Sequence, residues 1–421
     1  MRSWSTALAG ATIVACGGMY GADEPAATTD RADGGADDDA PSPPPDGGEP
    51  TTRECRAQRI VHLVAGMGGL AWFTLVWPVP SVISSFDPAY AYDDPTRAAP
   101  APGTSTAHPL YARRVDGAIV WEGTGKQPMP TVLVAGRNQT HTDSPITTRM
   151  GAHEIVAAGA AAQESLAAPL ASLRFVLPAL HYGPAPDAPP IRDVASVGDA
   201  VDAIAEVTTL TEAQRAELAP GADLASWTGP NAPGAVVALA TFLRFTATAF
   251  RDGLVGTVVM PAMSTDPHEV FSNGNAAPTA DALGRVLHRF YEELSQSSEP
   301  SCTRAGEAVS LADNVVLLVS GDTPKNPFRR DSWPDGTPGG ANWIYARANG
   351  YLVPGWFGQV TPTGKASFNP STGALDPAAA ADSAERAALA GVLFAMTRGD
   401  AAYVAGLDSG TYQGLVPADL P

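Results

Sequence analysis

The sequence predicts an α/β protein built on a central, mostly parallel sheet that helices cover on both faces. Short β-branched and leucine-rich runs recur along the chain, and each has the length of a buried strand. Segments with helical periodicity alternate with these runs, which favours parallel strands joined by crossover helices. The 42 glycines and 39 prolines among 421 residues indicate many turns and long irregular connections.

Five apolar runs are expected to form the strands. In chain order they are Ile60–Val64, Thr131–Ala135, Leu173–Leu177, Leu254–Met260 and Val315–Val319. The first and the last of these runs are typical of central strands in a parallel sheet, because they are apolar along nearly their whole length.

Four segments with helical patterns accompany these strands. They are Asp199–Val207, Ala235–Phe250, Ala280–Gln296 and Ser383–Thr397. In Ala280–Gln296 the apolar positions 283, 286, 287, 290 and 294 fall on one face, and Thr279 is expected to start the helix. No repeat or second low-complexity linker interrupts residues 55–421, so we expect a single α/β domain there.

Residues 1–16, MRSWSTALAGATIVAC, indicate an export signal. Arg2 precedes an apolar run that is too short to span a bilayer, which needs about 20 residues. The run ends in Ile13-Val14-Ala15-Cys16, which resembles a bacterial lipobox, the signal whose cysteine is acylated and becomes the mature N-terminus. We therefore expect a lipid anchor on Cys16; the alternative is an ordinary signal peptide with an incidental cysteine.

Residues 17–54 are expected to be a disordered acidic linker. The part from Gly21 to Glu54 has ten acidic and two basic residues and no large apolar side chain. Such a segment buries too little surface to offset the entropy of ordering, and its charges repel one another. Cation capture by Asp37–Asp39 is the alternative. The protein is thus predicted to be an exported, membrane-anchored lipoprotein facing the periplasm or the cell surface.

The two other cysteines are expected to form a disulfide. Cys55 lies just before the first predicted strand, and Cys302 lies shortly before the last. If both strands are parallel, the two cysteines meet at the N-terminal edge of the sheet, opposite the edge where α/β proteins bind ligands. Two unrelated thiols are the alternative.

Several classes of partner are disfavoured by composition and motifs. The net charge of −18 leaves too few cations to neutralise phosphates, so nucleic acid is not an expected partner. The chain has no Walker loop and no G-x-G-x-x-G, so no nucleotide cofactor is expected. It also has no G-x-S-x-G elbow and no H-E-x-x-H. The glycines of Gly66–Gly69 would let a backbone approach an anion, but glycine turns after strands are common.

Polar residues after the predicted strands are the candidates for chemistry, because ligands bind at the C-terminal ends of strands in α/β sheets. Asp266 and His268 follow the strand Leu254–Met260 and are suited to ligate a divalent metal of undetermined identity. The alternative is an Asp-Pro turn followed by a surface histidine.

Two other strands are also followed by candidate metal ligands. His141 and Asp143 come after Thr131–Ala135, and Asp322 comes shortly after Val315–Val319. A polar loop is the favoured alternative for the first pair, and turn formation in Gly-Asp-Thr-Pro is the alternative for Asp322.

Aromatic residues are concentrated in one glycine-rich stretch. They are Trp333, Trp343, Tyr345, Tyr351, Trp356 and Phe357. Exposed, they would form a sugar-stacking platform for a carbohydrate-binding protein; the alternative is that they pack a loop onto the core.

Several motifs occur in a suggestive order. They are Gly68-Gly69, Phe86-Asp87-Pro88, Asp266 with His268, Ser320, Thr323-Pro324 and Arg330-Asp331. In this order they resemble a secreted, sulfatase-like family of bacterial proteins within the alkaline-phosphatase superfamily. That family has Gly-Gly and Phe-Asp-Pro after its first strand, Trp-Asp-Thr-His after a middle strand, and Ser-Glu-Phe-Gly-Arg-Thr-Pro and Arg-Asp-His after a later one.

The resemblance implies an alkaline-phosphatase-like fold with two bound metals and a Ser or Thr nucleophile that hydrolyses phosphate or sulfate esters. It adds Asp331 to the candidate ligands. The sequence departs from the family pattern where Gly321 replaces the glutamate of Ser-Glu-Phe and Ser332 replaces the histidine of Arg-Asp-His. The family's Ser and Asp between Gly-Gly and Phe-Asp-Pro have no clear counterpart, so the nucleophile is not assigned.

Besides the carbohydrate-binding protein considered for the aromatic residues, two functions are consistent with these residues. The first is a metal-dependent ester hydrolase whose metal is bound by Asp266 and His268, with further candidate ligands at Asp322, Asp331, His141 and Asp143. The second is a catalytically impaired relative that serves as a cell-surface binding or structural lipoprotein.

Overall fold

The computed structural model describes part of the chain. The described residues are 54–55, 57–76, 112–115, 118–121, 131–135, 177–182, 191–219, 224–270, 275–321, 325–326, 332–337, 340, 342–353, 355–361, 364–376, 378–379, 381–405 and 412–421. The predictions for Cys16 and for the linker, except its last residue Glu54, lie outside these residues. So do four of the six predicted metal ligands, namely His141, Asp143, Asp322 and Asp331.

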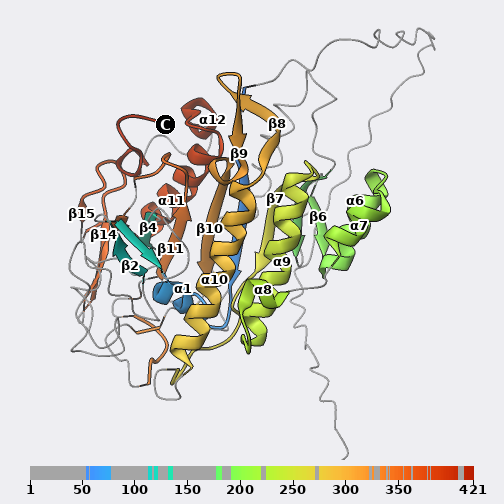
Figure 1. Cartoon of the computed structure of the whole chain (residues 1–421). Helices are drawn as coiled ribbons and strands as arrows, with labels where there is room; N and C mark the ends of the chain where they lie inside the picture. The colour runs from blue at the N-terminus through green and yellow to red at the C-terminus, as the bar shows by residue number, and fades with distance from the viewer. Residues whose placement is uncertain are drawn as a thin grey trace, which may run out of the picture. The chain divides into compact units, whose positions relative to one another are not determined.

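An eight-stranded sheet forms the centre of the molecule (Figure 1). Its strands are β1 (Arg59–Ala65), β4 (Thr131–Ala135), β5 (Leu177–Tyr182), β6 (Ile191–Val194), β7 (Val255–Pro261), β10 (Val315–Gly321), β11 (Asn342–Arg347) and β12 (Gly355–Phe357). They lie in the order β12-β4-β11-β10-β1-β7-β5-β6. The strands β10, β1, β7, β5 and β6 run parallel to one another, whereas β11 runs antiparallel to both β10 and β4. The predicted α/β class with a mostly parallel sheet is confirmed.

Four of the five predicted strands coincide with observed strands within two residues at each end. They are β1, β4, β7 and β10, and β1 and β10 are the adjacent central strands that their apolar composition predicted. The fifth prediction, Leu173–Leu177, was wrong at its C-terminal end, because β5 begins at Leu177 and continues to Tyr182. The strand β11 was missed because its apolar residues lie inside a glycine-rich stretch that has the composition of a loop.

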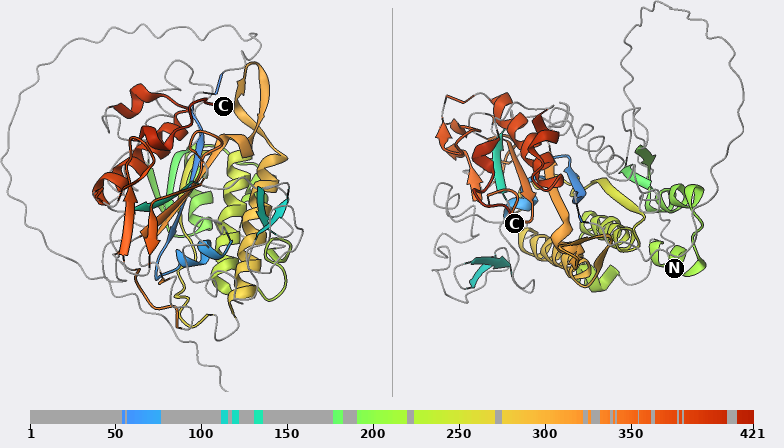
Figure 2. Two further views of the ribbon diagram at one scale, coloured as in Figure 1. Left: turned by 90° about the vertical axis from the view of Figure 1, so that its left-hand side faces the viewer. Right: turned by 90° about the horizontal axis from the view of Figure 1, so that it is seen from above.

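Helices cover both faces of the sheet, as predicted (Figure 2). One face is covered by α1 (Ala71–Val76), α9 (Gly234–Arg251) and α10 (Ala276–Ser295), and the other by α11 (Ala381–Met396). The strand β10 contributes to both layers in alternation: Val315, Leu317 and Val319 pack with α9 and α10, whereas Val316 and Leu318 pack with α11. This two-sided burial explains the continuous apolar run in its sequence.

The predicted helices are all present, with shifted ends. Asp199–Val207 is α6 (Val197–Val207), which Ser196 caps by accepting a hydrogen bond from the Asp199 N–H. The helix α10 begins at Ala276, so the predicted start at Thr279 was wrong. Its Pro278 lies in the first turn, where the missing N–H would have no intrahelical acceptor in any case.

The remaining elements are short. They are the helices α7 (Glu212–Leu218), α8 (Leu224–Thr228) and α12 (Ala401–Ala405), the 3-10 turns η2 (Leu311–Asn314) and η4 (Gln413–Leu415), the hairpins β2 (Ala112–Val115) with β3 (Ala118–Trp121) and β8 (Ser298–Arg304) with β9 (Glu307–Ser310), and a three-stranded sheet of β13 (Gln359–Thr361), β14 (Gly364–Phe368) and β15 (Leu375–Asp376).

The helix α9 is the one helix, among the residues described, with the length and apolarity of a membrane span; its mean hydropathy is 1.2. Half of its residues are buried inside the protein, and it packs against β7 and α10. A buried core helix has the same apolar profile, and the position of α9 against one face of the sheet explains its composition.

The predicted disulfide between Cys55 and Cys302 is present, with a Cα–Cα distance of 4.9 Å. It lies at the N-terminal edge of the sheet, where Cys55 N–H also donates to the carbonyl of Thr303 at 2.8 Å. Cys302 belongs to the hairpin β8–β9 that precedes β10, so the bond joins the start of β1 to this hairpin.

A buried ion pair lies beside the disulfide. Arg59 donates from Nε and Nη2 to the two carboxylate oxygens of Glu299 at 2.8 and 2.5 Å, and the two side chains are 1% and 0% exposed. Ser301 and Asn314 donate to the same carboxylate at 2.5 and 2.7 Å. Burial alone would raise the pKa of Glu299, but the Arg59 charge and these hydrogen bonds outweigh it and lower the pKa from 4.5 to about 2.

The aromatic stretch forms core rather than a binding platform. Buried side chains are found at Trp333, Trp343, Tyr345, Tyr351 and Phe357. The side chain of Trp356 lies outside the described ones. The sugar-stacking interpretation was therefore wrong for these five residues, and the alternative, packing onto the core, is confirmed.

Candidate metal centre

Two loops meet at the C-terminal edge of the parallel strands. One follows β7 and carries Asp266 and His268; the other follows β10 and returns to carry Lys325 and Asp335. Since β7 and β10 flank β1 on either side, their C-terminal ends lie two strands apart at the same edge. This is the edge where open α/β sheets bind ligands.

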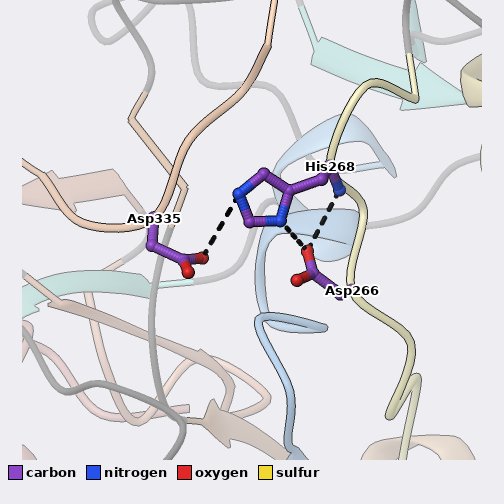
Figure 3. A group of neighbouring side chains, drawn as sticks. All are labelled: Asp266, His268 and Asp335. Carbon is purple, nitrogen blue, oxygen red and sulfur yellow. Dashed lines mark hydrogen bonds and ion pairs between the residues drawn. The ribbon is translucent and has the colours of Figure 1, made fainter.

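Asp266 and His268 form a pre-oriented pair (Figure 3). The backbone N–H of His268 donates to Asp266 Oδ1 at 3.0 Å, which is the hydrogen bond of an Asx turn. The same oxygen lies 2.7 Å from His268 Nδ1. The turn and the ligand interpretations are therefore compatible, because the turn itself presents the imidazole beside the carboxylate.

Asp335 completes the group from the second loop. Its Oδ1 lies 4.0 Å from His268 Nε2, and one ligand atom from each of Asp266, His268 and Asp335 lies within 4.8 Å of the others (Figure 3). These side chains are 33%, 41% and 42% exposed, so solvent and ions reach them. Imidazole nitrogen and carboxylate oxygen together are a donor set that suits zinc and neighbouring divalent ions.

The sequence did not single out Asp335. It stands in Pro334-Asp335-Gly336, a combination typical of a turn. Its approach to the site depends on the β-bridge between Lys325 and Asp335 and on the hydrogen bond from Asn326 N–H to the Pro334 carbonyl at 2.8 Å. The sequence feature that marks Asp335 is this Pro-Asp-Gly turn, which lies in the segment after β10 and is only a weak sign of a ligand.

The ammonium group of Lys325 lies among the three ligands. Its Nζ is 2.5 Å from Asp266 Oδ1 and 2.8 Å from His268 Nδ1, and it forms an ion pair with Asp335 Oδ1. The Lys325 side chain is 0% exposed, in contrast to the carboxylates around it. The site thus contains its own positive charge.

The charge distribution keeps Asp266 ionised. Partial burial alone would raise the pKa of its carboxyl, but hydrogen bonds from Lys325 and His268 outweigh this and lower the pKa below its ordinary value. His268 Nδ1 lies between Asp266 Oδ1 and Lys325 Nζ, so it donates to the carboxylate in one tautomer and accepts from the ammonium in the other, while Nε2 faces Asp335.

Two tryptophans fix the loops behind these side chains. Trp72 Nε1–H donates to the carbonyl of Thr265 at 3.1 Å, and its ring meets that of Trp333 edge to face at 6.4 Å. Trp333 is next to Ser332, whose carbonyl accepts from the Glu269 N–H at 3.3 Å. The two loops are therefore linked through a buried aromatic contact and through their backbones.

The same loops contain unfavourable backbone conformations, as do five other described positions. Positive φ angles occur at Met263 (49°), Glu269 (54°) and Trp333 (39°), none of which is glycine. Such conformations are unfavourable for L-residues and persist where surrounding contacts impose them, which is common at functional sites.

The glycines at the ends of β1 and β10 allow backbones to pack at this edge. A Cβ atom on Gly69 would lie 1.6 Å from the Met263 carbonyl oxygen, and one on Gly321 would lie 2.1 Å from that of Ala65. Both positions therefore exclude every side chain. The close approach that Gly69 permits is to the protein's own β7 loop.

The chain matches no family model, no curated protein and no solved structure.

Proposed function

We propose that this chain is an exported, lipid-anchored protein whose alkaline-phosphatase-like domain binds a divalent cation and uses it to hydrolyse phosphate or sulfate esters. The observation that supports this most is the convergence of Asp266, His268 and Asp335 from two separate loops at the C-terminal edge of the parallel strands. The ligand identities, their exposure and their mutual distances all suit a hydrated cation that a substrate can reach.

Each residue has a distinct part in this proposal. Asp266 and Asp335 each supply a carboxylate oxygen and His268 supplies a ring nitrogen, while the Asx turn holds the Asp266 carboxylate beside the ring. A bound cation would polarise an ester oxygen and lower the pKa of a bound water. Trp72 and Trp333 hold the two loops in register so that the ligands stay within reach of one another.

Export and anchoring rest on a different part of the chain. The apolar run ending at Cys16 and the acidic segment after it are the sequence features of a tethered lipoprotein. The Cys55–Cys302 disulfide supports an oxidising compartment, because such bonds persist mainly outside the reducing cytosol. Replacing Cys16 with serine is expected to shift the protein from the detergent phase to the aqueous phase; unchanged partitioning would contradict the anchor.

The cation and its chemistry are tested together on the purified protein. Isothermal titration with Zn²⁺, Mn²⁺, Mg²⁺ and Ca²⁺ is expected to give one ion per chain for at least one of them, with His268→Gln and Asp335→Asn weakening it at least tenfold. Hydrolysis of p-nitrophenyl phosphate and p-nitrophenyl sulfate is then measured with that ion. Asp376→Asn is the matched control, because Asp376 also forms an Asx turn, with the Ala378 N–H at 2.9 Å, but lies on β15.

A second candidate function is a catalytically impaired surface protein of the same fold. Gly321 supports it, because the backbone there approaches Ala65 so closely that no glutamate fits at the position where the resembled family has one. Ser332 stands in place of the family's histidine. Cation binding in the titration without turnover of either ester would favour this second function.

A further inference from the structure

The position of Lys325 has a consequence for cation binding. Its ammonium nitrogen contacts a ligand atom of each of Asp266, His268 and Asp335. No described contact connects it to anything else in these loops except the backbone bridge to Asp335. We propose that Lys325 is a built-in cation that occupies the metal position and must leave it before a divalent ion binds; this inference rests on the cation binding proposed above.

Crowding at Asp266 Oδ1 is the first support. This oxygen lies 2.5 Å from the Lys325 ammonium, 2.7 Å from His268 Nδ1 and 3.0 Å from the His268 backbone nitrogen. A carboxylate oxygen has about two lone-pair positions, so it has none left for a metal while the ammonium and the backbone N–H both donate to it. The Asx turn fixes the backbone donor, which makes the lysine the one that is free to leave.

Charge is the second support. Asp266 and Asp335 carry two negative charges, and the Lys325 ammonium offsets one of them. A divalent cation at the same ligands would meet that ammonium within a few ångströms, and the two positive charges would repel strongly in a partly buried site. Metal and ammonium therefore exclude each other from the space between the carboxylates.

Burial is the third support. The Lys325 side chain is fully buried although the ligands around it are a third or more exposed. The ammonium therefore reaches solvent only when it releases the carboxylates, a movement that its flexible four-carbon stem allows. Without a metal, the lysine keeps the carboxylates close together and the site assembled.

The Zn²⁺ affinity of Lys325 variants tests this proposal directly. Lys325→Met keeps a long apolar stem and removes the charge, so we expect it to bind Zn²⁺ at least tenfold more tightly than the unmodified chain in isothermal titration. Lys325→Arg keeps the charge and is expected to bind no more tightly than the unmodified chain. Lys365→Met, on β14, is the control for loss of a lysine and is expected to leave the affinity unchanged.

The outcomes separate this inference from the function it rests on. Equal Zn²⁺ affinity of the unmodified chain and a folded Lys325→Met variant would overturn the role of Lys325 and leave cation binding in place. Binding by neither protein would overturn both.

A second measurement needs no variant. Zn²⁺ at saturation is expected to raise the reductive methylation of Lys325 at least threefold in the unmodified chain, measured by mass spectrometry with Lys365 as the internal reference. Unchanged methylation of Lys325 in the zinc-bound protein would contradict its displacement.

Discussion

The two edges of the sheet use the same chemistry, a buried cation paired with carboxylate, to opposite effect. At the N-terminal edge Arg59 and Glu299 are both buried, and both Glu299 oxygens accept bonds from Arg59, Ser301 or Asn314. At the C-terminal edge the cation Lys325 is buried, but its partners Asp266 and Asp335 are partly exposed.

This difference shows which ion pair can be exchanged for a ligand. A closed pair in which every hydrogen bond is made gives nothing for a ligand to bind, and breaking it leaves a buried charge. An open pair leaves carboxylate oxygens in solvent, where another cation competes for them. The N-terminal edge is accordingly structural, and the C-terminal edge is the one that we propose for function.

The largest expected effect is a loss of stability when the disulfide at the N-terminal edge is removed. The disulfide spans 247 positions, and the chain-entropy model predicts that removing it costs about 5 kcal/mol of unfolding free energy. The double variant Cys55→Ser, Cys302→Ser should therefore show a much lower urea midpoint. Cys16→Ser is the matched control and should keep the midpoint of the unmodified chain; equal midpoints for all three would show that the bond does not stabilise this edge.

A somewhat smaller effect on stability is expected from the Arg59–Glu299 ion pair, and it depends on pH. The pKa of Glu299 is lowered from 4.5 to about 2 in the folded state, so the unfolded state takes up the proton more readily as the pH falls. About 3 kcal/mol of stability is expected to be present above pH 4.5 and to be lost as the pH falls toward 2.

Glu299→Gln tests this assignment. The variant should be about 3 to 5 kcal/mol less stable at neutral pH, because Arg59 loses its countercharge, and its stability should depend less on pH between 4.5 and 2. Urea denaturation at several pH values measures both quantities. Glu307→Gln, at an exposed position of the same hairpin, is the control; the idea fails if the two variants share one pH profile.

The smallest expected effect is on stability and cation affinity when Trp72, which contacts the loop after β7, is replaced. Trp72→Phe removes the hydrogen bond to the Thr265 carbonyl and should cost about 1 kcal/mol of stability. Because Thr265 precedes Asp266, we also expect cation affinity to fall about threefold, measured by isothermal titration. Trp227→Phe, a buried tryptophan of α8, is the control; equal effects of both variants on affinity would contradict a positioning role for Trp72.

The fold was largely predictable because its strongest signals are local. The central strands are continuous apolar runs, and the cysteines before β1 and β10 were placed at one edge by the parallel arrangement alone. The antiparallel β11 was not predictable in this way, because its apolar residues lie in a glycine-rich stretch and its pairing with β10 and β4 is non-local.

Only the part of the candidate site that lies within one loop was predictable from the sequence. Asp266 and His268 are two positions apart after a strand, and the Asx turn between them is a short-range feature. Asp335 and Lys325 come to the site through pairing within the segment after β10, and a lysine carries no sequence signal of a metal site because metal ligands are acidic, imidazole or thiol groups. Local spacing does not encode such pairing.

Zinc titration of the unmodified chain beside its Asp335→Asn and Lys325→Met variants tests the central claim most directly. The account predicts one Zn²⁺ per chain, at least tenfold weaker in Asp335→Asn and at least tenfold tighter in Lys325→Met. Saturable binding that neither substitution changes, or no binding by any of the three folded proteins, would contradict a cation site at this edge of the sheet.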